Sequence, residues 1–323
     1  MTLVDTFEHQ PVMRDEIVAA FASVPSGVVV DATLGGGGHS EAILRSRADV
    51  DVIGLDRDPH AIAAASARLD EFGSRFTATR TTFDALGEVL DAAAVPIVSA
   101  VLFDLGVSSH QLDTAHRGFS YRAAGPVDMR MDPDAPRSAA DVVNHADVDE
   151  LAEILHRNSD ERFARRIARA IVAARPIADT AELADIVASA IPAPARRRGG
   201  HPATRTFQAL RIEVNRELEQ LPVALHDAVQ HLGPGGRLAV LSYHSGEDRI
   251  VKSVMREYAE PCTCPAGYPC VCGAIATLTT VRDVPKRPSA AECAANPRAA
   301  SARLRVVERC SELEEVSGGT RTA

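Results

Sequence analysis

The chain has 323 residues, of which 46% are hydrophobic, and its formal net charge is −9. This length and content suffice for one elaborated domain or two with a sizeable core, and no apolar run is long enough to span a bilayer. The acidic balance excludes a uniformly basic nucleic-acid binder. Residues 1–5 lack the basic and apolar regions of a signal peptide, so we expect a cytoplasmic protein without a membrane partner.

The N-terminal part predicts a helix over 14–22 and then a strand, a glycine turn and a second helix. The apolar run Val28–Val30 ends in Asp31, and four glycines, Gly35–Gly38, follow. Successive glycines let the backbone take positive φ values and approach a ligand closely. The first N–H groups of the helix predicted over 40–46 have no hydrogen-bond acceptor within that helix. This arrangement is typical of a phosphate or nucleoside pocket.

The next strand, Val52–Asp56, ends in an acid that suits the two hydroxyls of a ribose, so the pocket fits an adenosine-containing cofactor. A dinucleotide fingerprint needs a third glycine where Ser40 stands, and Asp31 would lie poorly beside a pyrophosphate. A carboxylate there suits the amino group or sulfonium of S-adenosylmethionine. The residues therefore favour this methyl donor, with a dinucleotide or a turn that binds nothing as the alternatives.

The middle of the chain predicts an α/β sheet with a helical insertion. A helix begins at Asp58-Pro59, and the run Ile97–Asp104 has the continuous apolar character of a central parallel strand that ends in an acid. Apolar residues recur at helical spacing over Ala139–Ile191, and Pro, Gly and Arg in Ala193–Thr204 predict a mobile loop. The strand Arg237–His244 then returns the chain to the sheet.

Charge is distributed unevenly along this chain. Residues 157–216 hold twelve Arg against six acids, and residues 281–310 hold seven Lys or Arg against three acids. A basic face on an acidic body can dock a phosphate backbone. A solvated helix surface is the alternative for either cluster.

Four cysteines lie close together near the C-terminus, in the order Cys262, Cys264, Cys270 and Cys272. Closely spaced thiols in a cytosolic chain favour zinc over disulfides. The C-x-C spacing is tighter than the usual C-x₂-C knuckle, and reduced thiols without a metal are the alternative.

Twelve short segments, spread in order over nearly the whole chain, carry a more specific resemblance. The chain resembles the bacterial 16S ribosomal RNA cytosine-N4 methyltransferase family, which modifies a cytidine in the decoding region of the small ribosomal subunit. The matching segments are His9–Val12, Asp31–Ser40, Gly54–Pro59, Leu105–Ser109, Gln111–Asp113, Arg117–Ser120, Asp128–Met131, His201–Arg205, Phe207–Ile212, Tyr243–Ser245, Glu247–Arg249 and Asn296–Arg298.

The resemblance implies a class I (Rossmann-like) S-adenosylmethionine-dependent methyltransferase sheet with an inserted helical domain that helps to hold RNA. We expect the methyltransferase domain over 1–135 and 207–312, the insertion over 136–206 and a disordered tail over 313–323. The substrate would be 16S rRNA or the small ribosomal subunit, and a homodimer is left open. The implied donor-binding residues are Gly37, Gly38, His39, Asp56, Phe83, Asp104 and Gln111.

The chemistry requires a group that orients the cytosine amine, whose lone pair is delocalised into the ring. Asp104, at the end of its strand, is the expected catalytic residue, and His39 and His244 are the other candidates. A paired cytosine hides this amine, so the base must be flipped out or single-stranded. An RNA-binding or assembly factor that keeps the pocket without catalysis is a different class of function that stays open.

Overall fold

The computed structural model describes residues 11–196, 200–265 and 271–311. The chain forms two compact units, the first made of Met1–Gly106 and Gln220–Ala323 and the second of Val107–Glu219. Within the described residues, no helix is both long and apolar enough to cross a membrane.

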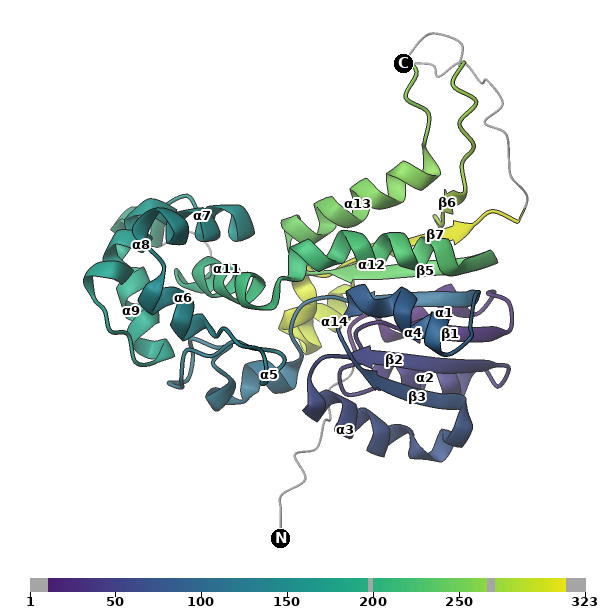
Figure 1. Cartoon of the computed structure of the whole chain (residues 1–323), viewed down its shortest axis with the longest axis horizontal. Helices are drawn as coiled ribbons and strands as arrows, with labels where there is room; N and C mark the ends of the chain where they lie inside the picture. The colour runs from purple at the N-terminus through teal and green to yellow at the C-terminus, as the bar shows by residue number, and fades with distance from the viewer. Residues whose placement is uncertain (1–10, 197–199, 266–270, 312–323) are drawn as a thin grey trace. The chain divides into compact units, whose positions relative to one another are not determined.

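The first unit is built on a seven-stranded sheet with the order β3-β2-β1-β4-β5-β7-β6 (Figure 1). Strands β1 to β5 pair in parallel, and β7 is antiparallel to both of its neighbours. The order reverses between β1 and β4, which is where doubly wound sheets bind ligands beyond the carboxyl ends of their strands. The predicted Rossmann-like α/β sheet is therefore confirmed. The strands are β1 (Gly27–Asp31), β2 (Val50–Asp56), β3 (Phe76–Arg80), β4 (Val98–Asp104), β5 (Leu232–Ser242), β6 (Leu278–Thr280) and β7 (Arg303–Arg309).

Hydrophobic cores cover both faces of this sheet, because alternate side chains of a strand point to opposite faces. Val30 and Phe103 belong to one core, and their neighbours Val29 and Leu102 belong to the other. This two-sided burial explains why β1 and β4 are continuous apolar runs. The helices of this unit are α1 (Arg14–Phe21), α2 (Gly38–Ser46), α3 (Pro59–Leu69), α4 (Leu86–Ala92), α12 (Glu217–His231, which begins at the unit boundary), α13 (Ser245–Ala259) and α14 (Ala290–Ala295).

The second unit is helical and longer at both ends than the predicted insertion of 136–206. Phe119, Val127, Met129 and Met131 are buried in the same core as the later helices, so the segment before residue 136 belongs to this unit. Its helices are α5 (Ser109–Asp113), α6 (Ala139–His145), α7 (Val148–Ser159), α8 (Ala164–Ala173), α9 (Thr180–Ala190), α10 (Ala193–Arg196) and α11 (Thr204–Asn215). The short α10 lies where a loop was expected.

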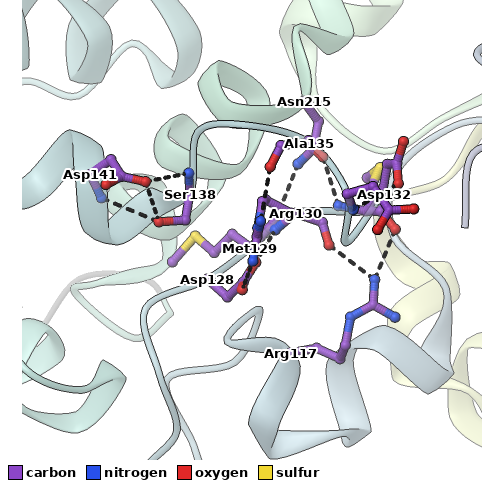
Figure 2. Close-up of polar contacts among 11 residues, drawn as sticks. Arg117, Asp128, Met129, Arg130, Asp132, Ala135, Ser138, Asp141 and Asn215 are labelled. Carbon is purple, nitrogen blue, oxygen red and sulfur yellow. Dashed lines mark hydrogen bonds and ion pairs between the residues drawn. The ribbon is translucent and has the colours of Figure 1, made fainter.

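A buried polar network fixes the segment Asp128–Met131 in this unit, as Figure 2 shows. The Asn215 amide donates to the Met129 carbonyl and accepts from the Met131 N–H, both at 2.8 Å. Arg117 donates to the carbonyls of Arg130 and Met131, both at 2.9 Å. Met129 has φ +59°, a left-handed conformation that a non-glycine residue keeps only when its surroundings hold it.

Candidate functional site at the carboxyl edge of the sheet

The glycine turn connects β1 to α2 at the carboxyl edge of the sheet. Gly35 and Gly37 have φ values of +51° and +76°, which glycine adopts without strain. A Cβ on Gly35 would meet no described atom closer than 3.9 Å, so space is open beside the turn. A Cβ on Gly37 would press on Ala65 and Leu69 at 3.1 Å. The first glycine therefore leaves room for a ligand, and the second lets the turn pack on α3.

Asp56 joins the end of β2 to this turn. Its Oδ2 accepts a hydrogen bond from the Gly35 N–H and its Oδ1 accepts one from the Asp58 N–H, both at 2.8 Å. Burial raises the pKa of Asp56 to about 6, although these two bonds lower it. Each carboxylate oxygen can accept a second hydrogen bond. Asp56 is thus held in place by backbone donors and keeps acceptor capacity for hydroxyl groups.

The Asp31 side chain makes its hydrogen bonds within the protein. Its side chain is only 1% exposed, and it accepts hydrogen bonds from the Ser40 hydroxyl at 2.7 Å and from the Thr33 N–H at 3.3 Å. Burial raises its pKa, and nearby His39 opposes that shift. In this structure Asp31 secures the first turn of α2, in contrast to the direct contact with a cationic ligand that the sequence suggested.

Asp104, at the end of β4, lies between two ring-bearing side chains. The Tyr243 hydroxyl donates to its Oδ1 at 2.7 Å, and Nε2 of His39 lies 3.4 Å from its Oδ2. Its side chain is 24% exposed, whereas that of His39 is 7% exposed. Burial, and then the charge of Asp104, raise the pKa of Tyr243 well above its usual value. Tyr243 is therefore a neutral donor that orients a partly accessible carboxylate.

The sequence-based prediction overlooked Tyr243, which it placed inside a strand. Strand β5 ends at Ser242, and its register pairs Leu241 with Asp104. Tyr243 is the second residue past that pair, so it emerges at the same edge as Asp104. The available signal was that the strand predicted over Arg237–His244 also ends at the carboxyl edge of the sheet, where Asp104 lies.

His244 caps a helix. Its Nδ1 accepts from the N–H groups of Gly246 and Glu247 at 3.2 and 3.4 Å at the start of α13. Its Nε2 lies 3.1 Å from a Glu247 carboxylate oxygen, and the other oxygen of Glu247 accepts from the Tyr243 N–H at 2.7 Å. The helix cap uses Nδ1, and Nε2 is buried beside Glu247 without a hydrogen bond to any residue that the structure describes. Burial and the cap therefore argue against His244 as the group that orients an amine.

Phe83 and Asp84 follow β3 at the same edge of the sheet. The Phe83 ring packs edge-on against Phe103, with centroids 6.1 Å apart, and the Arg57 guanidinium lies 5.5 Å from the Phe83 centroid. Asp84 Oδ1 is buried and accepts no hydrogen bond from any residue that the structure describes. A buried acceptor without a donor costs free energy. The pair therefore offers an aromatic surface and an unused acceptor next to each other.

Gln111 belongs to the second unit. It is 5% exposed, and its side chain accepts from the Ser108 N–H at 3.2 Å in a capping box at the start of α5. Its predicted contact with the methyl donor stays a prediction. The loop predicted over Ala193–Thr204 includes Arg196, which ends α10, while residues 197–199 lie outside the described residues. Cys270 also lies outside them.

The comparisons with known proteins identify the family. The sequence profile of the MraW methylase family matches residues 6–310. The chain belongs to this family. The MraW methylase family therefore spans both units, and it agrees with the resemblance found in the sequence.

Two similar relatives cover nearly the full chain. Both are called "Ribosomal RNA small subunit methyltransferase H". The protein of Symbiobacterium thermophilum is 49% identical over 314 residues, which cover 96% of this chain and 99% of the relative. That of Acidothermus cellulolyticus is 50% identical over 316 residues, which cover 96% of each. The solved rRNA methylase from Streptococcus thermophilus is 12% identical, with a TM-score of 0.41 over 94% of this chain and 99% of that one. This last likeness is too remote to support an inference.

Proposed function

We propose that this protein transfers a methyl group from S-adenosylmethionine to the N4 amine of a cytidine in the decoding region of 16S rRNA. The observation that carries the proposal is membership of the MraW methylase family over residues 6–310. Relatives about half identical are named as methyltransferases of small-subunit ribosomal RNA. The substrate would be the RNA or the small ribosomal subunit, and the reaction would take place in the cytoplasm.

The residues at the carboxyl edge of the sheet fit an adenosine-containing methyl donor. The free acceptor sites of Asp56 suit ribose hydroxyls, and the ring of Phe83 suits an adenine face. The unsatisfied Asp84 Oδ1 suits the adenine amine. Gly37, Gly38, His39 and Asp104 complete the donor site that we propose in the first unit, and Gln111 stays a residue that the family resemblance implies. S-adenosylmethionine supplies an electrophilic methyl group on its sulfonium.

Asp104 is the group that we assign to the cytosine amine. The amine is a weak nucleophile, so it gains from an acceptor that holds its N–H bonds in a fixed direction. The Tyr243 hydroxyl holds Asp104 Oδ1 at 2.7 Å, and the remaining exposure of the side chain leaves room for a second donor. Tyr243 is a positioning residue in this proposal, because it acts on the substrate only through Asp104.

The helical unit is the part that we assign to RNA. Residues 157–216, most of which lie in α7 to α11, hold six more arginines than acids. Phosphate contacts position a protein on RNA, and specific recognition of RNA acts mainly on unpaired bases. The target cytidine must also be unstacked so that its amine reaches the donor.

The test is methyl transfer with the purified chain. Tritiated S-adenosylmethionine is incubated with 16S rRNA or small subunits from a strain that lacks the protein, and the RNA is digested to nucleosides for mass spectrometry. We expect label in N4-methylcytidine, and we expect S-adenosylhomocysteine, but not NAD, to raise the melting temperature. The variant that tests the role of Asp104 is Asp104→Asn, which should transfer little label even when S-adenosylmethionine is saturating. RNA binding without transfer would favour the assembly-factor alternative, and stabilisation by NAD alone would contradict the donor site.

A further inference from the structure

The segment between α13 and β6 carries a cysteine cluster that the proposed methyl transfer does not use. The Sγ atoms of Cys262, Cys264 and Cys272 all lie within 4.8 Å of one another, and those of Cys262 and Cys272 are 3.7 Å apart. A disulfide would need about 2.05 Å. Two thiolates bound tetrahedrally to one zinc ion at 2.3 Å lie about 3.8 Å apart. The observed separation is therefore that of two thiols in contact and not of a disulfide, and it is close to the spacing of two ligands on one zinc ion.

The three thiols come from two arms of the chain that extend from the first unit (Figure 1). Residues 260–265 leave α13 and carry Cys262 and Cys264, and residues 271–277 return to β6 and carry Cys272. At the base of the arms, the Thr277 N–H donates to the Tyr258 carbonyl at 3.0 Å. This hydrogen bond therefore ties the returning arm to the end of α13.

The outer parts of the arms have little apolar burial to hold them together. Val271 is 88% exposed and Ile275 is 38% exposed. Ordering such a segment costs conformational entropy, and exposed side chains return little hydrophobic free energy. A metal ion bound by ligands from both arms would supply the missing stabilisation, because binding free energy becomes folding free energy where the site forms only in the folded chain.

We propose that Cys262, Cys264 and Cys272 bind one zinc ion as thiolates and that this ion fastens the two arms to each other. Soft thiolate ligands select zinc over magnesium or calcium. Bound zinc holds each thiol in its deprotonated form. The site is separate from the donor pocket, since the 15-residue helix α13 places roughly 22 Å between its two ends. Zinc therefore has a structural role and takes no part in methyl transfer.

The experiment measures metal in the full-length protein. An untagged chain is purified with reduced thiols and without chelator from cells supplied with zinc, desalted and analysed by mass spectrometry of elements. We expect about one zinc per chain in the wild type. Cys262→Ser, Cys264→Ser and Cys272→Ser should each lose most of it. Cys293→Ser and Cys310→Ser, which change cysteines outside the cluster, are the matched controls and should retain it.

Two further readouts separate metal binding from misfolding. Cobalt(II) added to the zinc-free wild type should give thiolate charge-transfer absorption that the three cluster variants lack. Thermal shift with S-adenosylhomocysteine should be the same for all variants, because the donor pocket is elsewhere, and zinc removal should make the arms more sensitive to protease. A reduced wild type without stoichiometric zinc or the cobalt absorption would overturn the proposal. Equal loss of metal in the control variants, or retention in the cluster variants, would overturn it as well.

Discussion

The clearest physical prediction concerns the carboxylate of Asp56 in the protein without ligand. Burial raises its pKa from 3.8 to about 6, so at pH values between these two the folded protein holds a proton that the unfolded chain has lost. Stability therefore falls as pH rises through this window, and the loss is complete above about pH 6. The pKa of Asp56 differs by about two between the folded and unfolded states, and at 1.36 kcal/mol per pH unit the free energy of unfolding falls by ~3 kcal/mol in total. This value covers the whole range from below pH 3.8 to above pH 6, with a fully solvated carboxyl in the unfolded chain.

Asp56→Asn isolates this effect because asparagine does not titrate. Its amide leaves the N–H of Gly35 or Asp58 without an acceptor, which costs about 1–3 kcal/mol at every pH. The informative quantity is consequently the difference between wild type and variant as a function of pH. Between pH 4 and pH 7, with pKa values of 3.8 in the unfolded chain and about 6 in the folded protein, the wild type should lose ~2.4 kcal/mol relative to the variant, or roughly 5–10 °C in melting temperature at 2–4 °C per kcal/mol. Thermal unfolding of both proteins across this range is the assay. A difference that stays constant within ~0.5 kcal/mol would refute the burial argument.

Three further predictions concern Asp56, Tyr243 with Asp104, and the buried Asn215 of the helical unit. Asp56→Ala should weaken S-adenosylmethionine binding by about 1.5–3 kcal/mol. Wild-type affinity should be about tenfold lower at pH 5 than at pH 7, since protonation of Asp56 at a pKa of about 6 removes an acceptor. Calorimetry that finds no change in either case contradicts the assignment of Asp56 to the donor. Tyr243→Phe should slow single-turnover methylation at saturating donor but leave donor affinity unchanged, and Asp104→Asn should slow it more; equal losses of donor affinity in both would make them binding residues only. Asn215→Ala should destabilise the helical unit by ~2–4 kcal/mol, because it leaves the Met129 carbonyl and the Met131 N–H buried without partners. Chemical denaturation measures this loss. A loss of less than ~1 kcal/mol would argue that water replaces the amide.

The fifth prediction concerns RNA. Replacing Arg196, Arg197 and Arg198 with Ala should lower RNA affinity. The slope of log affinity against log salt concentration should become shallower, by the equivalent of up to about three phosphate contacts. S-adenosylmethionine affinity should stay the same. Two of these arginines lie outside the described residues, so the prediction depends on sequence alone. Binding curves at several salt concentrations provide the measurement, and identical slopes for both proteins would favour a solvated loop without a partner.

Local sequence was sufficient for the elements that surround the donor pocket. Apolar runs that end in Asp31, Asp56 and Asp104 became β1, β2 and β4, because a strand buried on both faces needs a continuous apolar segment. The positive φ values at Gly35 and Gly37 agree with the glycine turn that the sequence predicted. Strands β6 and β7 escaped prediction, since β6 has three residues and β7 alternates apolar and charged residues near an edge of the sheet.

The roles of individual side chains depended on contacts between distant segments. Asp31 and Asp104 both end apolar strands, yet Asp31 is buried with a hydrogen bond from Ser40. Tyr243, 139 residues along the chain and just past the end of β5, orients Asp104, which stays partly accessible. The parallel register of β4 with β5 decides that second contact, and spacing along the chain does not contain it. The ends of the helical unit likewise depended on which apolar residues share one core. The sequence thus determined strands β1, β2 and β4, the glycine turn and the family resemblance, because these depend on local pattern and on motifs in order. Only the tertiary structure decided which polar groups are satisfied inside the fold and which remain available, because hydrogen bonds and burial are set by neighbours in space.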